Sequence, residues 1–170
     1  DSQDPVIAFL ESGLPLADGA LFNRTVTPIV VATDATKVNL SVTLNGEPFA
    51  SGTPVADEGG YTLQATAVDE GGNSANLAAS FVLDMTAPTF VTVLPPDNTL
   101  VAAPEIALSG EVAGAQSVTV DGLACTLTVE AFACPSCSLT DGERIFTLLA
   151  RDAAGNEAPR QHRIRRDGTG

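Results

Sequence analysis

Two short acidic segments hold the side chains of this chain that are best suited to chemistry. Residues 69–73, Asp-Glu-Gly-Gly-Asn, recur 83 residues later as residues 152–156, Asp-Ala-Ala-Gly-Asn. Asp1 and Asp84 are separated by the same 83 residues. Carboxylate and amide oxygens are the ligands that Ca²⁺ prefers, and it takes about six to eight of them. The candidate calcium ligands are Asp1, Asp69, Asn73, Asp84, Asp152 and Asn156.

The same acids have a second explanation that needs no metal. Asp and Asn suit tight turns, because their side chains bond the nearby backbone and tolerate left-handed geometry. Turn chemistry alone accounts for the pattern Asp-x-x-Gly-Asn, so both interpretations stay open at this stage.

The three cysteines lie close together in the second half of the chain. Cys134-Pro-Ser-Cys137 matches the spacing of thiol oxidoreductases, but that chemistry needs a helix N-terminus, and nothing around it has a helical pattern. Residues 125–134 instead predict a hairpin centred near residues 128–130, which sets Cys125 opposite Cys134. We expect a structural Cys125–Cys134 disulfide first, Cys125–Cys137 second and Cys134–Cys137 third.

A basic stretch near the C-terminus stands out in an otherwise acidic chain. Its candidate partner-binding residues are Arg160, Arg163, Arg165 and Arg166. They could dock an acidic partner such as a neighbouring repeat or an anionic glycan, or they could protect an exposed strand edge from aggregation. His162, the single histidine, has no companion ligands and is expected at the surface rather than in a metal site.

These residues must be positioned by strands, because alternation of period two dominates and no sustained helical period appears. Residues 38–44 alternate apolar and polar side chains up to Asn45-Gly46, and 118–120 do so up to Asp121-Gly122, both pairs typical of tight hairpins. Residues 61–68 predict a further strand, and the Asp-x-x-Gly-Asn loop leads into a final strand in which Leu77, Ala79, Phe81 and Leu83 face inward. Shorter strands are expected at 6–10, 28–32, 89–93 and 105–109.

The repeat divides the chain into two units, residues 1–87 and 88–170, each of about seven short strands in an antiparallel sandwich. In the second unit Phe146, Leu148 and Ala150 take the inward positions. The second unit has seven more residues than the first between the 121–122 turn and its next strand, and this interval holds Cys134 and Cys137. The last strand of the second unit lacks the apolar face of its counterpart.

The composition narrows the possible partners. The chain carries 21 acidic and 8 basic side chains and a net charge of −13. Such a chain repels nucleic acid and anionic lipid. No apolar run approaches the length of a membrane span. No signal-peptide pattern is found in these residues, and because the chain opens at Asp1 within a repeat, a signal could lie upstream of it. Clustered cysteines favour an oxidising compartment.

Residues 61–73, Tyr-Thr-Leu-Gln-Ala-Thr-Ala-Val-Asp-Glu-Gly-Gly-Asn, followed by Asp84-Met-Thr-Ala-Pro88, resemble the bacterial immunoglobulin-like repeats of large cell-surface and secreted proteins. The resemblance covers both halves of the chain. It implies two tandem immunoglobulin-like sandwiches, in which Asp84 at the exit of the first unit approaches Asp152 and Asn156 of the second. It also implies that Ca²⁺ could brace such junctions, as in some relatives.

The function that follows is a non-catalytic, extracellular or cell-surface spacer, stalk or adhesin segment. The alternative is a carbohydrate- or protein-binding accessory module of a secreted enzyme. We expect a monomer whose partners are neighbouring repeats, or a cell-surface protein or glycan. No phosphate-binding loop, zinc-type histidine cluster or serine nucleophile motif is present, so we do not expect an enzyme.

Overall fold

The computed structural model describes residues 2–168, which form strands, turns and loops. The chain divides into two compact units, Asp1–Met85 and Thr86–Gly170. The part of the chain that is described contains no helix long and apolar enough to cross a membrane.

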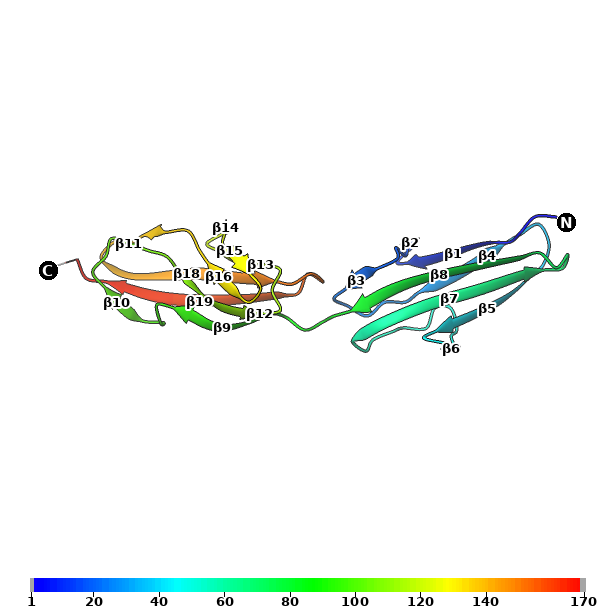
Figure 1. Ribbon diagram of the computed structural model, residues 1–170, viewed down its shortest axis with the longest axis horizontal. Coiled ribbons are helices and arrows are strands. Elements are labelled where there is room, and N and C mark those ends of the chain that lie inside the picture. Colours follow the sequence, from blue (N-terminus) through cyan, green and yellow to red (C-terminus); the bar gives the residue numbers. More distant parts are fainter. Residues whose placement is uncertain (1, 169–170) are drawn as a thin grey trace. The chain divides into compact units, whose positions relative to one another are not determined.

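The first unit is a β-sandwich of two sheets (Figure 1). One sheet has the strand order β2-β1-β4 and the other β3-β8-β7-β5-β6. The strands are β1 (Val6–Glu11), β2 (Leu14–Pro15), β3 (Ala20–Phe22), β4 (Ile29–Thr33), β5 (Val38–Leu44), β6 (Glu47–Pro48), β7 (Gly59–Asp69) and β8 (Ser74–Leu83). Phe9 and Val30 from the smaller sheet pack with Leu63, Phe81 and Leu83 from the larger one.

The second unit repeats this architecture with more breaks in its strands. The sheet order is β15-β16-β12-β9 on one side and β10-β19-β18-β13-β14 on the other, with a β11-β17 pair beside them. Its strands are β9 (Thr89–Leu94), β10 (Thr99–Val101), β11 (Glu105–Ile106), β12 (Ser109–Ala113), β13 (Ser117–Val120), β14 (Leu123–Ala124), β15 (Thr126–Thr128), β16 (Ala131–Ala133), β17 (Cys137–Ser138), β18 (Gly142–Arg151) and β19 (Glu157–Arg166).

Two tight turns set the register of the central hairpins. Asn45 and Gly46 have φ of 50° and 84°, and Asp121 and Gly122 have φ of 46° and 82°. Positive φ at both central residues matches the twist of the flanking strands, and Asn, Asp and Gly adopt it at low cost. The predicted hairpins at these dipeptides are confirmed.

Within each unit the chain enters at one end and leaves at the other. In the first unit Val6 pairs with Thr33, and the following strand begins at Val38 opposite Asp69. The β7–β8 loop therefore lies at the N-terminal end of the unit, and β8 finishes at the opposite, C-terminal end (Figure 1). In the second unit Thr89 pairs with Ala113, close in sequence to Ser117, whose partner is Arg151.

The alternation pattern placed most inward side chains correctly. Leu63, Ala65 and Ala67 are buried, and so are Phe146, Leu148 and Ala150 of the second unit. Leu77 shares the inward face with Ala79 and lies opposite Ala65, as predicted, but it is 37 % exposed because it lies where the two sheets separate. One prediction was wrong. The strand expected at 105–109 is divided between β11 and β12, which pair with different partners.

Candidate functional site

The repeated acidic segments form two matching loops, each at the N-terminal end of its unit. The backbone N–H of Asn73 donates to Asp69 Oδ1 at 2.8 Å, and the Asn73 side-chain amide donates to Asp69 Oδ2 at 2.7 Å. In the second unit Asn156 makes the same two bonds to Asp152, at 2.8 and 2.9 Å. Both carboxylates are almost fully buried. An Asp–Asn pair thus closes each loop, and the Asp side chain bonds the nearby backbone as it does in tight turns.

These hydrogen bonds favour the charged form of each acid. The Asn73 side chain contributes most to holding the pKa of Asp69 below its ordinary value, with help from the backbone N–H groups of the loop. Burial alone would raise the pKa of Asp152, but the bonds from Asn156 and from the loop backbone outweigh it and lower that pKa. Each loop therefore holds a carboxylate anion in place.

The predicted calcium site would take its ligands from both units. It stays a prediction. Asp84 belongs to the first unit, whereas Asp152 and Asn156 belong to the second. Asp1 lies outside the described residues. Among residues 2–168, no group of three or more His, Cys, Asp or Glu side chains is placed so that it could hold a metal ion.

The cysteine segment forms the predicted hairpin. Strands β15 and β16 pair with Leu127 opposite Phe132, which sets Cys125 opposite Cys134, and these two form a disulfide. Cys137 is a free, partly buried thiol in β17. The first-choice pairing is the one present. Cys134 packs into the core of the second unit, which agrees with a structural role for this disulfide.

The basic stretch forms β19, and two of its four arginines pair within their own unit. Arg163 Nε lies 3.2 Å from a Glu143 carboxylate oxygen, and an Arg166 nitrogen lies 2.8 Å from Asp141. Strand β18 flanks β19 along its whole length, and β10 covers Ile164–Arg166 on the other side. Arg160 and Arg165 form no ion pair with any described residue, so partner binding through them stays a prediction.

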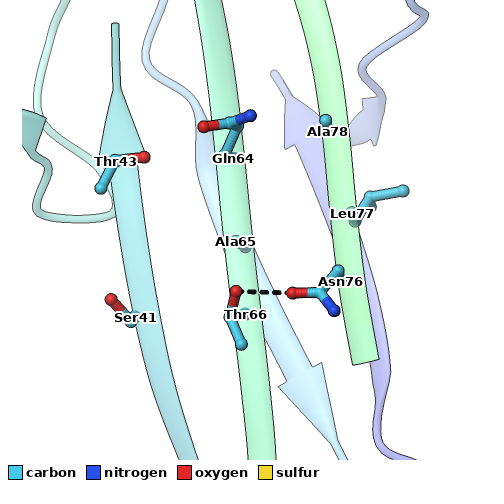
Figure 2. A pocket seen from close by; sticks show the side chains of 8 residues that line it. All are labelled: Ser41, Thr43, Gln64, Ala65, Thr66, Asn76, Leu77 and Ala78. Atoms are coloured by element: carbon cyan, nitrogen blue, oxygen red, sulfur yellow. Dashed lines mark hydrogen bonds between the residues drawn. The ribbon is translucent and has the colours of Figure 1, made fainter. Parts of the chain in front are cut away.

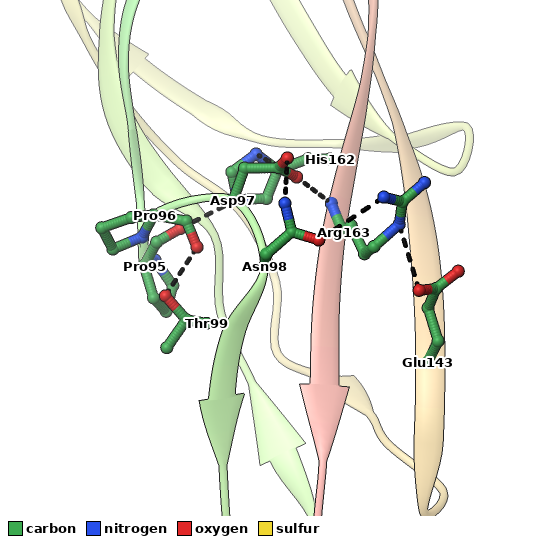
Figure 3. Close-up of polar contacts among 8 residues, drawn as sticks. All are labelled: Pro95, Pro96, Asp97, Asn98, Thr99, Glu143, His162 and Arg163. Carbon is green, nitrogen blue, oxygen red and sulfur yellow. Dashed lines mark hydrogen bonds and ion pairs between the residues drawn. The ribbon is translucent and has the colours of Figure 1, made fainter.

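His162 was expected at the surface, and this was wrong. Its side chain is fully buried, in phase with Ile164 on the inward face of β19. Nε2–H donates to the carbonyl oxygen of Pro95 at 2.8 Å, and Nδ1 lies 3.9 Å from Asp97 Oδ1 (Figure 3). Pro95, 67 residues away in sequence, satisfies Nε2, whereas the buried Nδ1 has no hydrogen-bond partner among the described residues.

A contact that the sequence analysis missed joins an early loop to the last strand of the first unit. Asp18 Oδ1 accepts the backbone N–H and the hydroxyl of Ser80, both at 2.7 Å. The N–H of Gly19 donates to the carbonyl oxygen of Ser80 at 2.8 Å. The two residues thereby hold both backbone groups of Ser80, and we call this arrangement the backbone clasp. The hydrogen bonds from Ser80 lower the pKa of Asp18.

The second unit has the same backbone clasp. Asp97 Oδ1 accepts the N–H of Arg163 at 2.6 Å, and the N–H of Asn98 donates to the Arg163 carbonyl oxygen at 2.7 Å (Figure 3). Gly19 and Asn98 both have positive φ, 76° and 65°. The signal in the sequence is weak but present: Asp-Gly-Ala-Leu-Phe at 18–22 and Asp-Asn-Thr-Leu-Val at 97–101.

In both units the backbone clasp begins a short parallel ladder. Strand β3 pairs in parallel with β8, from Ala20 opposite Phe81 to Phe22 opposite Leu83. Strand β10 pairs in parallel with β19, from Thr99 opposite Ile164. One further bond continues each ladder: Asp84 N–H to Phe22 O at 2.9 Å, and Asp167 N–H to Val101 O at 3.1 Å. The clasp and ladder together tie an early segment of each unit to its last strand.

Comparison with known proteins defines the fold and no more. No family model matches the sequence, and no curated protein matches it. Among solved structures, the chain is similar to the fibronectin(III)-like modules of Clostridium thermocellum CbhA, with 11% identity, a TM-score of 0.51, and coverage of 95% of this chain and 96% of that one. It is also similar to the N-terminal eight immunoglobulin domains of Down Syndrome Cell Adhesion Molecule, with 12% identity, a TM-score of 0.50, and coverage of 96% and 25%.

These similarities and the sheet orders define the class of fold: all-β, with two tandem immunoglobulin-like or fibronectin-III-like sandwiches. Identities this low carry no information on ligand or activity. The predicted fold class is confirmed. Such modules occur on many proteins of different function, so the role must be argued from the residues.

Proposed function

We propose that this chain is a tension-bearing spacer segment of an extracellular bacterial protein. The observation that carries the proposal is the backbone clasp with its parallel ladder, present in both units although Asn98 and Arg163 take the places of Gly19 and Ser80. A purely adhesive or catalytic role would not require the same tie between an early strand and the last strand in each unit.

The direction of the ladders supports this role. Strand β3 and strand β8 both run toward the C-terminal end of the first unit. Tension along the chain pulls β3 back toward the N-terminal end and β8 toward the C-terminal end. The hydrogen bonds between the two strands are then loaded in shear, and all of them must break together before the unit opens. The pairing of β10 with β19 has the same direction in the second unit.

Two further features are consistent with a position outside the cell. The Cys125–Cys134 disulfide is typical of oxidising compartments. The net charge of −13 keeps a long array soluble and discourages contact between neighbouring chains.

Single-molecule force spectroscopy on the two-unit chain, pulled through its ends, tests the proposal. We expect two unfolding events, one per unit. Asp18→Ala removes one clasp acceptor and should lower the force of one event, and Asp97→Ala should lower the other. Glu70→Ala is the matched control, because it removes one exposed carboxylate away from the ladder. If neither clasp variant changes an unfolding force, tension is not carried by these ladders and the proposal fails.

A further inference from the structure

The outward face that β5, β7 and β8 form in the first unit's large sheet has no charged residue of its own, and the Asp18 carboxylate from the loop before β3 reaches its edge at the Ser80 hydroxyl. Alternate residues of these strands form the face. These residues are Asn39, Ser41, Thr43, Gly60, Thr62, Gln64, Thr66, Val68, Ser74, Asn76, Ala78, Ser80 and Val82. All are exposed except Thr43, which is partly so. We call this surface the neutral face. The lack of charged residues on this face is unusual, because residues 1–87 carry 11 acidic and 2 basic side chains.

The fold does not impose this neutrality, because the second unit uses the same face differently. The outward side chains of β18 and β19 include Glu143, Arg151, Glu157, Arg163 and Arg165. Arg151 pairs with Glu157, and Arg163 with Glu143. Charged pairs across neighbouring strands are therefore compatible with this architecture, and their absence from the neutral face is a property of the first unit's sequence.

The centre of the neutral face is hollowed and lined by hydroxyl and amide groups (Figure 2). The hollow has a volume of about 400 Å³, and its lining on three strands consists of the polar residues Ser41, Thr43, Gln64, Thr66 and Asn76 and the apolar residues Ala65, Leu77 and Ala78. Thr66 Oγ1 donates to Asn76 Oδ1 at 2.7 Å. This bond fixes the amide so that both N–H donors of Asn76 remain for another group.

The remaining polar groups of the hollow are available to a ligand. The side chains of Ser41, Thr43 and Gln64 form no hydrogen bond with any residue that the structure describes. Together they offer donors and acceptors in similar number and no net charge. Neighbouring strands set these groups about 4.8 Å apart across the sheet, and alternate residues set them about 7 Å apart along it. A ligand that matches this array must be uncharged, extended, and able both to donate and to accept hydrogen bonds.

We propose that the neutral face binds an uncharged polysaccharide chain. Each sugar hydroxyl both donates and accepts, which is the complement of this surface. Anionic ligands are disfavoured by the acidic surroundings. The face also lacks the Trp, Tyr and Arg side chains that anchor protein partners. Because no aromatic ring is available for stacking, we expect weak binding with a Kd of about 1 mM, strengthened when units are repeated.

Affinity electrophoresis under native conditions tests this inference. The acidic protein is run in gels that contain a soluble neutral polysaccharide (a mixed-linkage β-glucan, xylan, galactomannan or dextran), and in a gel with anionic alginate. We expect the wild type to be retarded by at least one neutral polysaccharide and not by alginate. Gln64→Glu places a charge in the hollow and should weaken the retardation at least tenfold. Gln161→Glu makes the same chemical change on the outward face of β19 and should leave it unchanged.

The opposite results would overturn the inference. They are no retardation in any neutral gel, retardation by alginate alone, or equal effects of Gln64→Glu and Gln161→Glu. Size-exclusion chromatography gives an independent outcome: concentration-dependent dimers that Gln64→Glu abolishes would assign the neutral face to a second copy of the chain instead. None of these results depends on the force measurement, so this inference and the proposed spacer function can fail separately.

Discussion

The carboxylate of Asp18 accepts the backbone N–H of Ser80 at 2.7 Å, although 62 residues separate the two in the chain. Asp97 makes the same bond to Arg163 in the second unit, at 2.6 Å. Because the bond goes to the backbone, the side chain of the partner is free to change from Ser to Arg. The backbone clasp is thus conserved within the chain at the level of geometry, while the surface around it differs.

The left-handed residue of the backbone clasp gives a first prediction. Gly19 has φ of 76°, and a Cβ there would meet no atom within 4 Å. The cost of substitution therefore comes from backbone conformation alone, about 1 kcal/mol for Gly19→Ala. Gly19→Asn should cost less, because Asn tolerates this region and Asn98 occupies the same position in the second unit. Urea unfolding of both variants measures the difference, and equal destabilisation would contradict it.

The free energy of unfolding should decrease in acid, because Asp69 and Asp152 close their loops as carboxylate anions. The pKa values of Asp69 and Asp152 are lowered in the folded state from an ordinary value of 3.8, so the unfolded chain binds protons first as pH decreases. Their contribution is fully present above pH 3.8 and is lost as pH falls through the lower, folded-state pKa values. Asp69→Asn should therefore destabilise the protein at pH 7 and have a smaller effect near pH 2.

The matched control is Glu70→Gln, which neutralises an exposed carboxyl in the same loop. Thermal melts at several pH values should show little difference between this variant and the wild type. An effect of Asp69→Asn that stays constant between pH 7 and pH 2 would show that the charge of Asp69 does not stabilise the loop.

The disulfide should stabilise the second unit only. A bridge across a sequence separation of nine residues contributes about 2–3 kcal/mol by the chain-entropy account. We expect reduction, or Cys125→Ala with Cys134→Ala, to lower the melting temperature of one of two transitions. Cys137→Ser is the control and should leave the bridge intact. Titration of free thiols in the unfolded, unreduced chain should give one per molecule; three would contradict the bridge.

Calcium binding can be tested by comparing thermal unfolding curves of the protein in EDTA and in millimolar Ca²⁺. Both oxygens of the Asp152 carboxylate already accept hydrogen bonds from Asn156, so we expect the two curves to coincide. A calcium-dependent rise in melting temperature that Asp84→Ala abolishes would contradict this expectation. It would establish the junction of Asp84, Asp152 and Asn156 as a metal site.

Much of the fold could be predicted from local patterns. The 83-residue repeat, the Asn45-Gly46 and Asp121-Gly122 turns, and the hairpin that joins Cys125 to Cys134 were all accessible from residues close together in the chain. Such features depend on short-range backbone preferences and on the period-two alternation of strands. The buried face of β7 followed from the same alternation.

Features that depend on neighbours along the chain were accessible from the sequence: the longer strands, the two tight hairpins, the two units, and the preference for Cys125–Cys134 over the other two pairings. Features that depend on distant partners were not. His162 is buried because Pro95 supplies an acceptor, and Asp18 has a role because β8 passes beside it. The neutral face exists only because β5, β7 and β8 lie side by side. The pairing of β3 with β8 and of β10 with β19 joins segments far apart in the sequence, and no turn between neighbouring residues specifies it.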